Sequence, residues 1–164
     1  MLLSQTFTHR AGIKEGELIR GPDGIKVYIV NDFGYRRHIF NPAIFNMYRH
    51  FTWKSVKDVT QDVIEAYKVS DLYRALNDYK IYSLEEVDEV KGNAIKHHLA
   101  MTSEKFTEEG YDWNQVFIVN NKERDYYKEG GDLTTRAVTI DYVKVEKDPY
   151  GLISRSKLFE FNTR

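Results

Sequence analysis

The chain contains no cysteine among its 164 residues. It therefore has no disulfide bond, no thiolate nucleophile and no cysteine-ligated zinc. Its stability has to come from packing, and a chain of this length can bury roughly two-thirds of the surface that its unfolded form exposes. The absence of cysteine leaves the cellular compartment open.

Long apolar runs and a large net charge are also missing. No segment approaches the roughly 18 apolar residues that a membrane helix needs, so no membrane span is expected. The first ten residues, MLLSQTFTHR, lack the basic and apolar regions of a signal peptide. We therefore expect a protein that acts where it is made, in the cytoplasm or a virion, or an extracellular or cell-surface piece of an exported parent. The formal net charge of −1 argues against nucleic acid as a partner.

Aromatic residues, in contrast, are abundant. They make up 14% of the chain, and 12 of them are tyrosines, against an ordinary 41% of hydrophobic and 30% of charged residues. Tyrosine combines an apolar ring with a polar tip, and it is frequent in protein–protein contacts and suits stacking on sugar rings. The composition is that of a soluble globular protein, and its tyrosines are interpreted either as partner-binding side chains or as half-buried strand residues.

The sequence contains an internal repeat. The segment ELIRGPDGIKVY begins at Glu17, and the related segment DLYRALNDYKIY begins at Asp71, an offset of 54 (71 − 17). Farther on, Trp53 and Trp113 match at an offset of 60 (113 − 53), and most of the added length lies in the stretch SLEEVDEVKGN. Ordered matches of this kind predict tandem structural units. We predict an N-terminal arm (1–15), two repeat units (16–70 and 71–131) and a C-terminal β segment (132–164).

Each unit is predicted to hold three short antiparallel strands and two short helices, so the fold class is α+β. In the first unit, GPDG is a turn signal between two strand-like segments, and YRRHIF follows as a third strand. Asn41 and Pro42 predict a helix start, and the helix should run to about His50. The second helix should begin at Thr60 and, in the second unit, at Asn120. The C-terminal segment alternates apolar and polar residues and predicts a β-hairpin that closes a sheet or pairs with a neighbour.

Finer details of the second unit follow from capping signals. Thr102 should cap its first helix, and Gly110 should end it. Asn120 with Glu123 three positions later predicts a capping box. The segment WNQVFIV is expected to be a short buried strand or an extended link.

The repeat also predicts a core for each unit. In the first unit it comprises Leu18, Val27, Ile39, Phe45, Trp53, Val56 and Tyr67, and the matching residues of the second unit form another. We expect Phe45 and Phe106 to be structural core residues. We expect the same of Trp53 and Trp113, as buried residues and not as ligand platforms.

No motif for catalysis or metal binding stands out. The five histidines lack metal-ligand spacing, and neither a GxSxG segment nor a phosphate-binding glycine-rich loop is present. The acidic stretch from Glu85 to Glu89 lacks the calcium-loop pattern, so a solvated loop is the better interpretation. We predict no cofactor, no metal and no catalytic residue. The rival interpretation is a histidine-based or metal-assisted hydrolase that uses His38 or His98 with a nearby carboxylate.

A mixed basic and aromatic stretch is the candidate binding surface. It lies between Tyr35 and His50, where arginine, histidine and tyrosine alternate. Such a surface suits a protein partner, a glycan or a small anionic ligand. The predicted ligand or partner surface comprises Tyr35, Arg36, Arg37, His38, Tyr48, Arg49, His98 and Tyr111.

Residues 16–131 resemble a tandem repeat of secreted and surface-attached bacterial proteins. The resemblance is carried by the segments KVYIV and YRRHIF in the first unit, and by KIYSL and GYDW at Gly110–Trp113 in the second. The first unit departs from the pattern, with RHFTW in place of GYDW. The resemblance implies a non-enzymatic accessory module near cell walls or surface layers, with no agreed ligand.

The sequence therefore predicts a non-catalytic structural or binding module of a cell-surface or particle-attached protein. It would act through protein–protein contacts, self-assembly or contacts with cell-wall glycan. The alternatives are a virion or filament subunit that assembles through its termini, and the hydrolase named above.

Overall fold

The computed structural model describes residues 12–136. Both predicted repeat units lie in one compact unit that extends to Thr134. Most of the predicted N-terminal arm and the predicted C-terminal hairpin lie outside the described residues. In the part that is described, no helix is long and apolar enough to cross a membrane.

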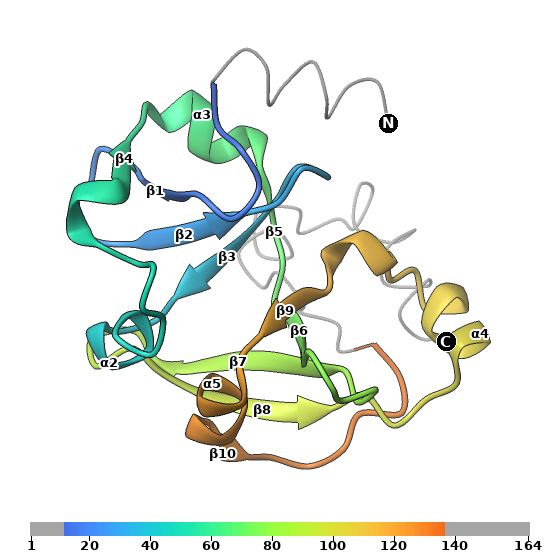
Figure 1. Cartoon of the computed structure of the whole chain (residues 1–164). Helices are drawn as coiled ribbons and strands as arrows, with labels where there is room; N and C mark the ends of the chain where they lie inside the picture. The colour runs from blue at the N-terminus through green and yellow to red at the C-terminus, as the bar shows by residue number, and fades with distance from the viewer. Residues whose placement is uncertain (1–11, 137–164) are drawn as a thin grey trace, which may run out of the picture. The chain divides into compact units, whose positions relative to one another are not determined.

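The fold is α+β, as predicted, with helices and two five-stranded sheets. The strands of the first half (residues 16–70) are β1 (Leu18–Arg20), β2 (Val27–Val30), β3 (Tyr35–Ile39), β4 (Val56–Asp58) and β5 (Lys68–Val69). Those of the second half (residues 71–131) are β6 (Leu72–Ala75), β7 (Tyr82–Asp88), β8 (Asn93–His98), β9 (Phe117–Val119) and β10 (Lys128–Glu129). The N-terminal sheet has the order β4-β1-β2-β3-β5, and the C-terminal sheet has the order β9-β6-β7-β8-β10 (Figure 1). Each half thus has two short parallel edge strands beyond the three antiparallel strands that were predicted.

The two sheets also share their register. Tyr28 pairs with His38 across β2 and β3, and Tyr82 pairs with His98 across β7 and β8. These pairings keep the sequence offsets of 54 (82 − 28) and 60 (98 − 38). Strand order and residue pairing therefore agree between the halves.

Short helices and 3-10 turns follow the three central strands of each half. They are α2 (Pro42–Phe45), α3 (Gln61–Ala66), α4 (Ser103–Glu108), α5 (Asn121–Tyr126), η1 (Trp53–Ser55) and η2 (Trp113–Gln115). The predicted cap at Asn41 is present, because its side chain accepts from the Ile44 N–H at 3.0 Å. The helix after it is shorter than predicted and ends at Phe45. Beyond that point the backbone continues in i→i+3 turns, such as Tyr48 N to Phe45 O at 3.3 Å, which carry the chain to Phe51.

The long hairpin of β7 and β8 belongs to the second half, and its tip contacts the first half. At its tip, the Gly92 carbonyl accepts a hydrogen bond from the Asn41 amide at 2.9 Å. Gly92 has φ +66°, and a Cβ there would lie 2.0 Å from the Phe40 carbonyl oxygen. Only glycine fits such a close approach with a positive φ. The SLEEVDEVKGN stretch that lengthens the second half is therefore a contact to the first half.

The largest hydrophobic cluster is shared by the two halves. It joins Leu18, Val27, Ile39 and Phe45 of the first half to Tyr73, Tyr82, Leu84, Phe117 and Tyr127 of the second, among others. The prediction of two separate cores is wrong in this respect. Each half keeps only a smaller cluster of its own, around Tyr67 in the first and around Phe106 in the second. A domain of about 55 residues is only marginally stable alone, and a core shared between the halves buries more surface.

A buried ion pair lies between the halves. Arg37 of β3 and Glu123 of α5 are 2% and 0% exposed, and Arg37 Nη2 lies 3.2 Å from Glu123 Oε2. The hydroxyls of Tyr48 and Tyr127 also donate to the Glu123 carboxylate. Burial and the Glu123 charge raise the pKa of both tyrosines, so their hydroxyls stay protonated as donors. Although burial alone would lower it, the carboxylate raises the pKa of Arg37.

This ion pair corrects two predictions. Asn120 does cap α5, accepting from the Glu123 N–H at 2.9 Å, but the Glu123 side chain bonds to Arg37 and the tyrosines instead of completing a capping box. Arg37, predicted on the ligand surface, is buried. On a strand, alternate side chains point to opposite faces, so Arg37 faces the interior with Tyr35 and Ile39.

Candidate functional site

The two tryptophans lie on the surface, so the prediction that they are buried core residues is wrong. Trp53 is 57% exposed and Trp113 is 50% exposed. Each begins a 3-10 turn and packs on a phenylalanine of the preceding helix: the Trp53–Phe45 and Trp113–Phe106 ring centroids are both 4.2 Å apart. Phe45 and Phe106 are buried, as predicted. The phenyl rings fill the core, and the indoles cover them from outside.

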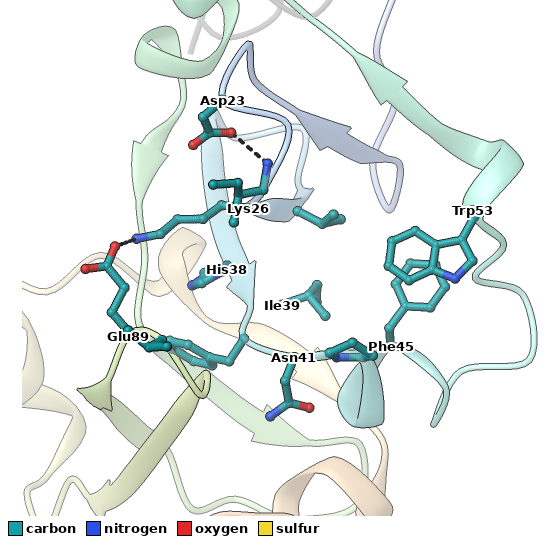
Figure 2. A pocket seen from close by; sticks show the side chains of 13 residues that line it. Asp23, Lys26, His38, Ile39, Asn41, Phe45, Trp53 and Glu89 are labelled. Atoms are coloured by element: carbon teal, nitrogen blue, oxygen red, sulfur yellow. Dashed lines mark hydrogen bonds and ion pairs between the residues drawn. The ribbon is translucent and has the colours of Figure 1, made fainter.

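The first pocket lies beside Trp53. It has a volume of about 480 Å³, and its walls come from β2, β3, α2 and the tip of the β7–β8 hairpin. Trp53 and Phe45 form a stacked aromatic wall with an interplanar angle of 8°. Figure 2 shows this stack facing His38 and Ile39 across the pocket. Lys26 and Glu89 lie beyond His38, at the side of the pocket away from Trp53.

A second pocket of about 590 Å³ lies beside Trp113. Its residues match those of the first pocket at sequence offsets of 54 (80 − 26), 60 (98 − 38 and 113 − 53) and 61 (102 − 41 and 106 − 45). Lys80, His98, Thr102, Phe106 and Trp113 stand where the first pocket has Lys26, His38, Asn41, Phe45 and Trp53. Arg74 and the fully exposed Tyr79 complete its rim. Each half thus carries one pocket with an exposed indole, a lysine and a histidine.

The histidines of the two pockets rest on tyrosines. His38 lies 5.4 Å from the Tyr28 ring, and His98 lies 5.8 Å from the Tyr82 ring, both between ring centroids. Burial, and then the Lys26 cation, lower the pKa of His38 to about 4. His38 is therefore neutral at physiological pH, with one hydrogen-bond donor and one acceptor.

The carboxylates near these histidines lie beyond hydrogen-bond distance. Nδ1 of His38 is 3.9 Å from Glu86 Oε1, and Nδ1 of His98 is 3.7 Å from Asp132 Oδ1. A general base needs a contact of about 2.6–3.2 Å with the group that orients it. Within residues 12–136, no cluster of three His, Asp or Glu side chains could hold a metal ion.

The remaining residues of the predicted binding surface are dispersed. The Tyr35 hydroxyl donates to Asp112 at 3.0 Å, and the Arg36 guanidinium donates to backbone carbonyls of Ile64 and Tyr67. Tyr48 bonds to Glu123, Tyr111 stacks on Phe106 at 4.9 Å, and Arg49 is exposed. Of the residues predicted for this surface, His38 lines the first pocket and His98 the second. The sequence does not form the single basic patch that the spacing suggested.

The pocket cations and indoles were missed as site residues. The sequence could have indicated them, because Lys26 matches Lys80 at the offset of 54 and Trp53 matches Trp113 at the offset of 60. We interpreted the indoles as core because large aromatic residues at repeated positions are usually buried. Exposure of the same residue type in both halves is what distinguishes a site from a core position.

Comparison with protein-family models, with curated proteins and with solved structures finds no match to this chain. Interpretation of the two pockets therefore depends on their own geometry and chemistry.

Proposed function

We propose that residues 16–131 arose by duplication of one unit, and that the protein is a non-catalytic glycan-binding module with one indole-walled pocket in each half. The observation that carries this proposal is the pair of matching pockets. An exposed tryptophan stacked on a buried phenylalanine stands at the same repeat position in both. Without a ligand-binding role, two exposed indoles would be unfavourable, because exposed aromatic surface promotes unwanted association between proteins.

The pocket chemistry suits a sugar ring. One side of a pyranose ring presents C–H groups that stack on an aromatic face, and its hydroxyl groups need donors and acceptors nearby. In the first pocket, the aromatic wall of Trp53 and Phe45 faces the neutral imidazole of His38. Ligand pockets of this volume are typically apolar with a few polar groups that fix orientation.

Two pockets in one compact unit favour a polymeric ligand. A chain of sugars that engages both pockets gains from effective concentration, so its avidity exceeds the affinity of either pocket. The resemblance of residues 16–131 to a repeat of surface-attached bacterial proteins favours cell-wall glycan as that polymer. A protein partner is the competing ligand class.

Co-sedimentation with purified bacterial cell wall, together with calorimetric titration of soluble N-acetylglucosamine oligomers, tests the proposal. We expect Trp53→Ala and Trp113→Ala each to weaken binding about 2- to 10-fold, as loss of one aromatic stack would, and the double variant to abolish detectable binding. Phe33→Ala is the matched control, because Phe33 is 48% exposed and lines neither pocket. Unchanged binding by the double variant would overturn the proposal.

A further inference from the structure

The two pockets differ in charge. The first is lined by Asp23, Lys26 and Glu89, so one cation faces two carboxylates. The second is lined by Arg74 and Lys80, and no carboxylate is among the lining residues that the structure describes. Arg74 and Lys80 match Arg20 and Lys26 of the first half at an offset of 54, so the partners of the two pairs of cations can be compared.

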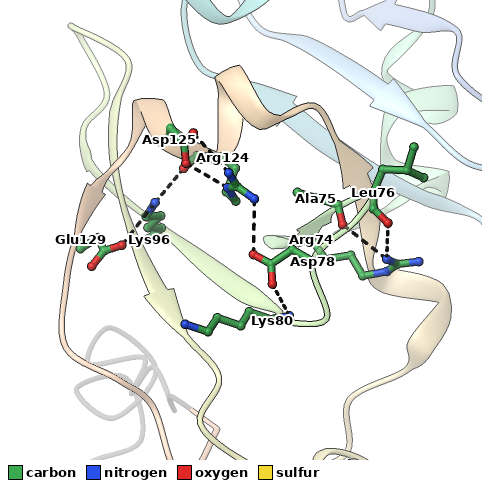
Figure 3. A network of polar contacts seen from close by, with 9 residues as sticks. All are labelled: Arg74, Ala75, Leu76, Asp78, Lys80, Lys96, Arg124, Asp125 and Glu129. Carbon is green, nitrogen blue, oxygen red and sulfur yellow. Dashed lines mark hydrogen bonds and ion pairs between the residues drawn. The ribbon is translucent and has the colours of Figure 1, made fainter.

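The first change concerns an arginine at the same strand position in both halves. Arg20 of β1 stands opposite Asp58 of β4, and its Nε and Nη2 donate to the two carboxylate oxygens at 2.7 and 3.2 Å. Arg74 of β6 stands opposite Ile118 of β9, which has no charge to offer. Its guanidinium instead makes long contacts with the carbonyl oxygens of Ala75 and Leu76, at 3.4 and 3.3 Å (Figure 3). These neutral contacts hold the side chain at the pocket without cancelling its charge.

The second change concerns the lysine that follows the turn. Lys26 Nζ lies 2.7 Å from Glu89 Oε1, a carboxylate supplied by the tip of the β7–β8 hairpin. At the matching Lys80, no carboxylate of the described residues comes within ion-pair distance of the ammonium group. Asp78 is nearby, but it accepts the Lys80 backbone N–H at 3.0 Å and pairs with Arg124 at 3.6 Å. Figure 3 shows the Lys80 side chain extending away from that carboxylate.

We infer that the second pocket selects an acidic glycan: a sugar stacks on Trp113, and carboxylate or phosphate groups of the glycan bind Arg74 and Lys80, whose side chains extend in opposite directions (Figure 3). This inference rests on the proposed function, and it assigns neutral sugars to the first pocket. Arginine and lysine beside an apolar surface form charge-assisted hydrogen bonds with such anions, and these are the stronger kind. The first half would then bind neutral sugars and the second half acidic sugars of one mixed polymer.

Single-pocket proteins separate the two preferences. Trp53→Ala leaves the second pocket intact, and Trp113→Ala leaves the first. Each is titrated with trigalacturonic acid and with its methyl ester, which has the same skeleton without the charge, and with glucose 6-phosphate as the phosphate probe. We expect Trp53→Ala to bind the free acid about tenfold more tightly than the ester, with a preference that weakens as salt rises. Trp113→Ala should show no preference for the acid.

Charge removal completes the test. Adding Lys80→Gln to Trp53→Ala should weaken the preference for acid, and adding Arg74→Gln as well should abolish it. Ester binding should persist in both variants, which also shows that the pocket is folded. Arg20→Gln in the same background is the matched control and should change neither affinity. Equal binding of acid and ester by Trp53→Ala would overturn this inference and leave the proposed function standing. Failure of every protein, the unmodified chain included, to bind any of these sugars or the cell-wall glycan would overturn both.

Discussion

The two halves of the molecule agree in backbone and differ in side-chain partners. Strand order and register match, and both halves place an indole over a helical phenylalanine. Yet Arg20 and Lys26 of the first half are each paired with a carboxylate, whereas Arg74 and Lys80 of the second half pair with no carboxylate among residues 12–136. Shared architecture therefore does not imply a shared ligand, because recognition depends on the side chains that line each site.

The largest expected loss of stability comes from removing one partner of the buried ion pair between the halves. Glu123→Ala leaves the Arg37 guanidinium buried without a counter-charge, and we expect a loss of about 3–5 kcal/mol in the free energy of unfolding. Denaturant melts monitored by circular dichroism measure it. The double variant Arg37→Met with Glu123→Leu should be less destabilised than Glu123→Ala alone, because it removes both charges together. A single variant as stable as the unmodified protein would show that the halves do not depend on this pair.

The next effect distinguishes the phenylalanines from the indoles that cover them. Phe45→Ala and Phe106→Ala remove buried rings and should each cost about 3–5 kcal/mol. Trp53→Ala and Trp113→Ala remove half-exposed rings and should cost about 1–2 kcal/mol, mainly through lost stacking. Thermal melts of the four variants give the comparison. If the tryptophan variants were as destabilised as the phenylalanine variants, the indoles would be core residues after all.

A smaller effect concerns acid stability through His38. Its folded pKa of about 4 lies below the ordinary value of about 6.5, so the unfolded chain binds a proton in that interval and the folded chain does not. The stability from the neutral, buried imidazole is complete above about pH 6.5 and is lost as pH falls toward 4. We expect His38→Gln to remove about 1–2 kcal/mol of this acid dependence, measured by urea melts at pH 7, 5.5 and 4. An unaltered profile in the variant would assign the acid dependence to other groups.

The smallest effect is expected at Arg20. Its ion pair with Asp58 is on the surface, where such pairs contribute little. Arg20→Gln should leave the thermal midpoint unchanged at physiological salt. A clear drop would mean that the paired arginine of the first half serves stability, and its comparison with Arg74 would then need a structural explanation.

Local signals in the sequence predicted the central strands and several helix starts. The GPDG turn, the caps at Asn41 and Thr102, and the strand from Tyr35 to Ile39 were predicted from residue types alone. The edge strands were harder. β5 and β10 are two residues long and exist through parallel pairing with residues far along the chain. No local pattern encodes such a contact.

The site was harder to predict than the fold. A repeated tryptophan has the same sequence signature whether it is buried or covers a pocket, because both roles need a large aromatic ring at a fixed position. Glu123 illustrates the converse case. Its spacing from Asn120 matched a surface capping motif, but tertiary contacts with Arg37 and two tyrosines outweighed the local option.

The tip of the β7–β8 hairpin makes the charge of the first pocket depend on the second half. Glu89 pairs with Lys26 at 2.7 Å, and the Gly92 carbonyl accepts from the Asn41 amide at 2.9 Å. A first half produced on its own would therefore lack the Glu89 carboxylate, and its lysine would face solvent and ligand without that partner.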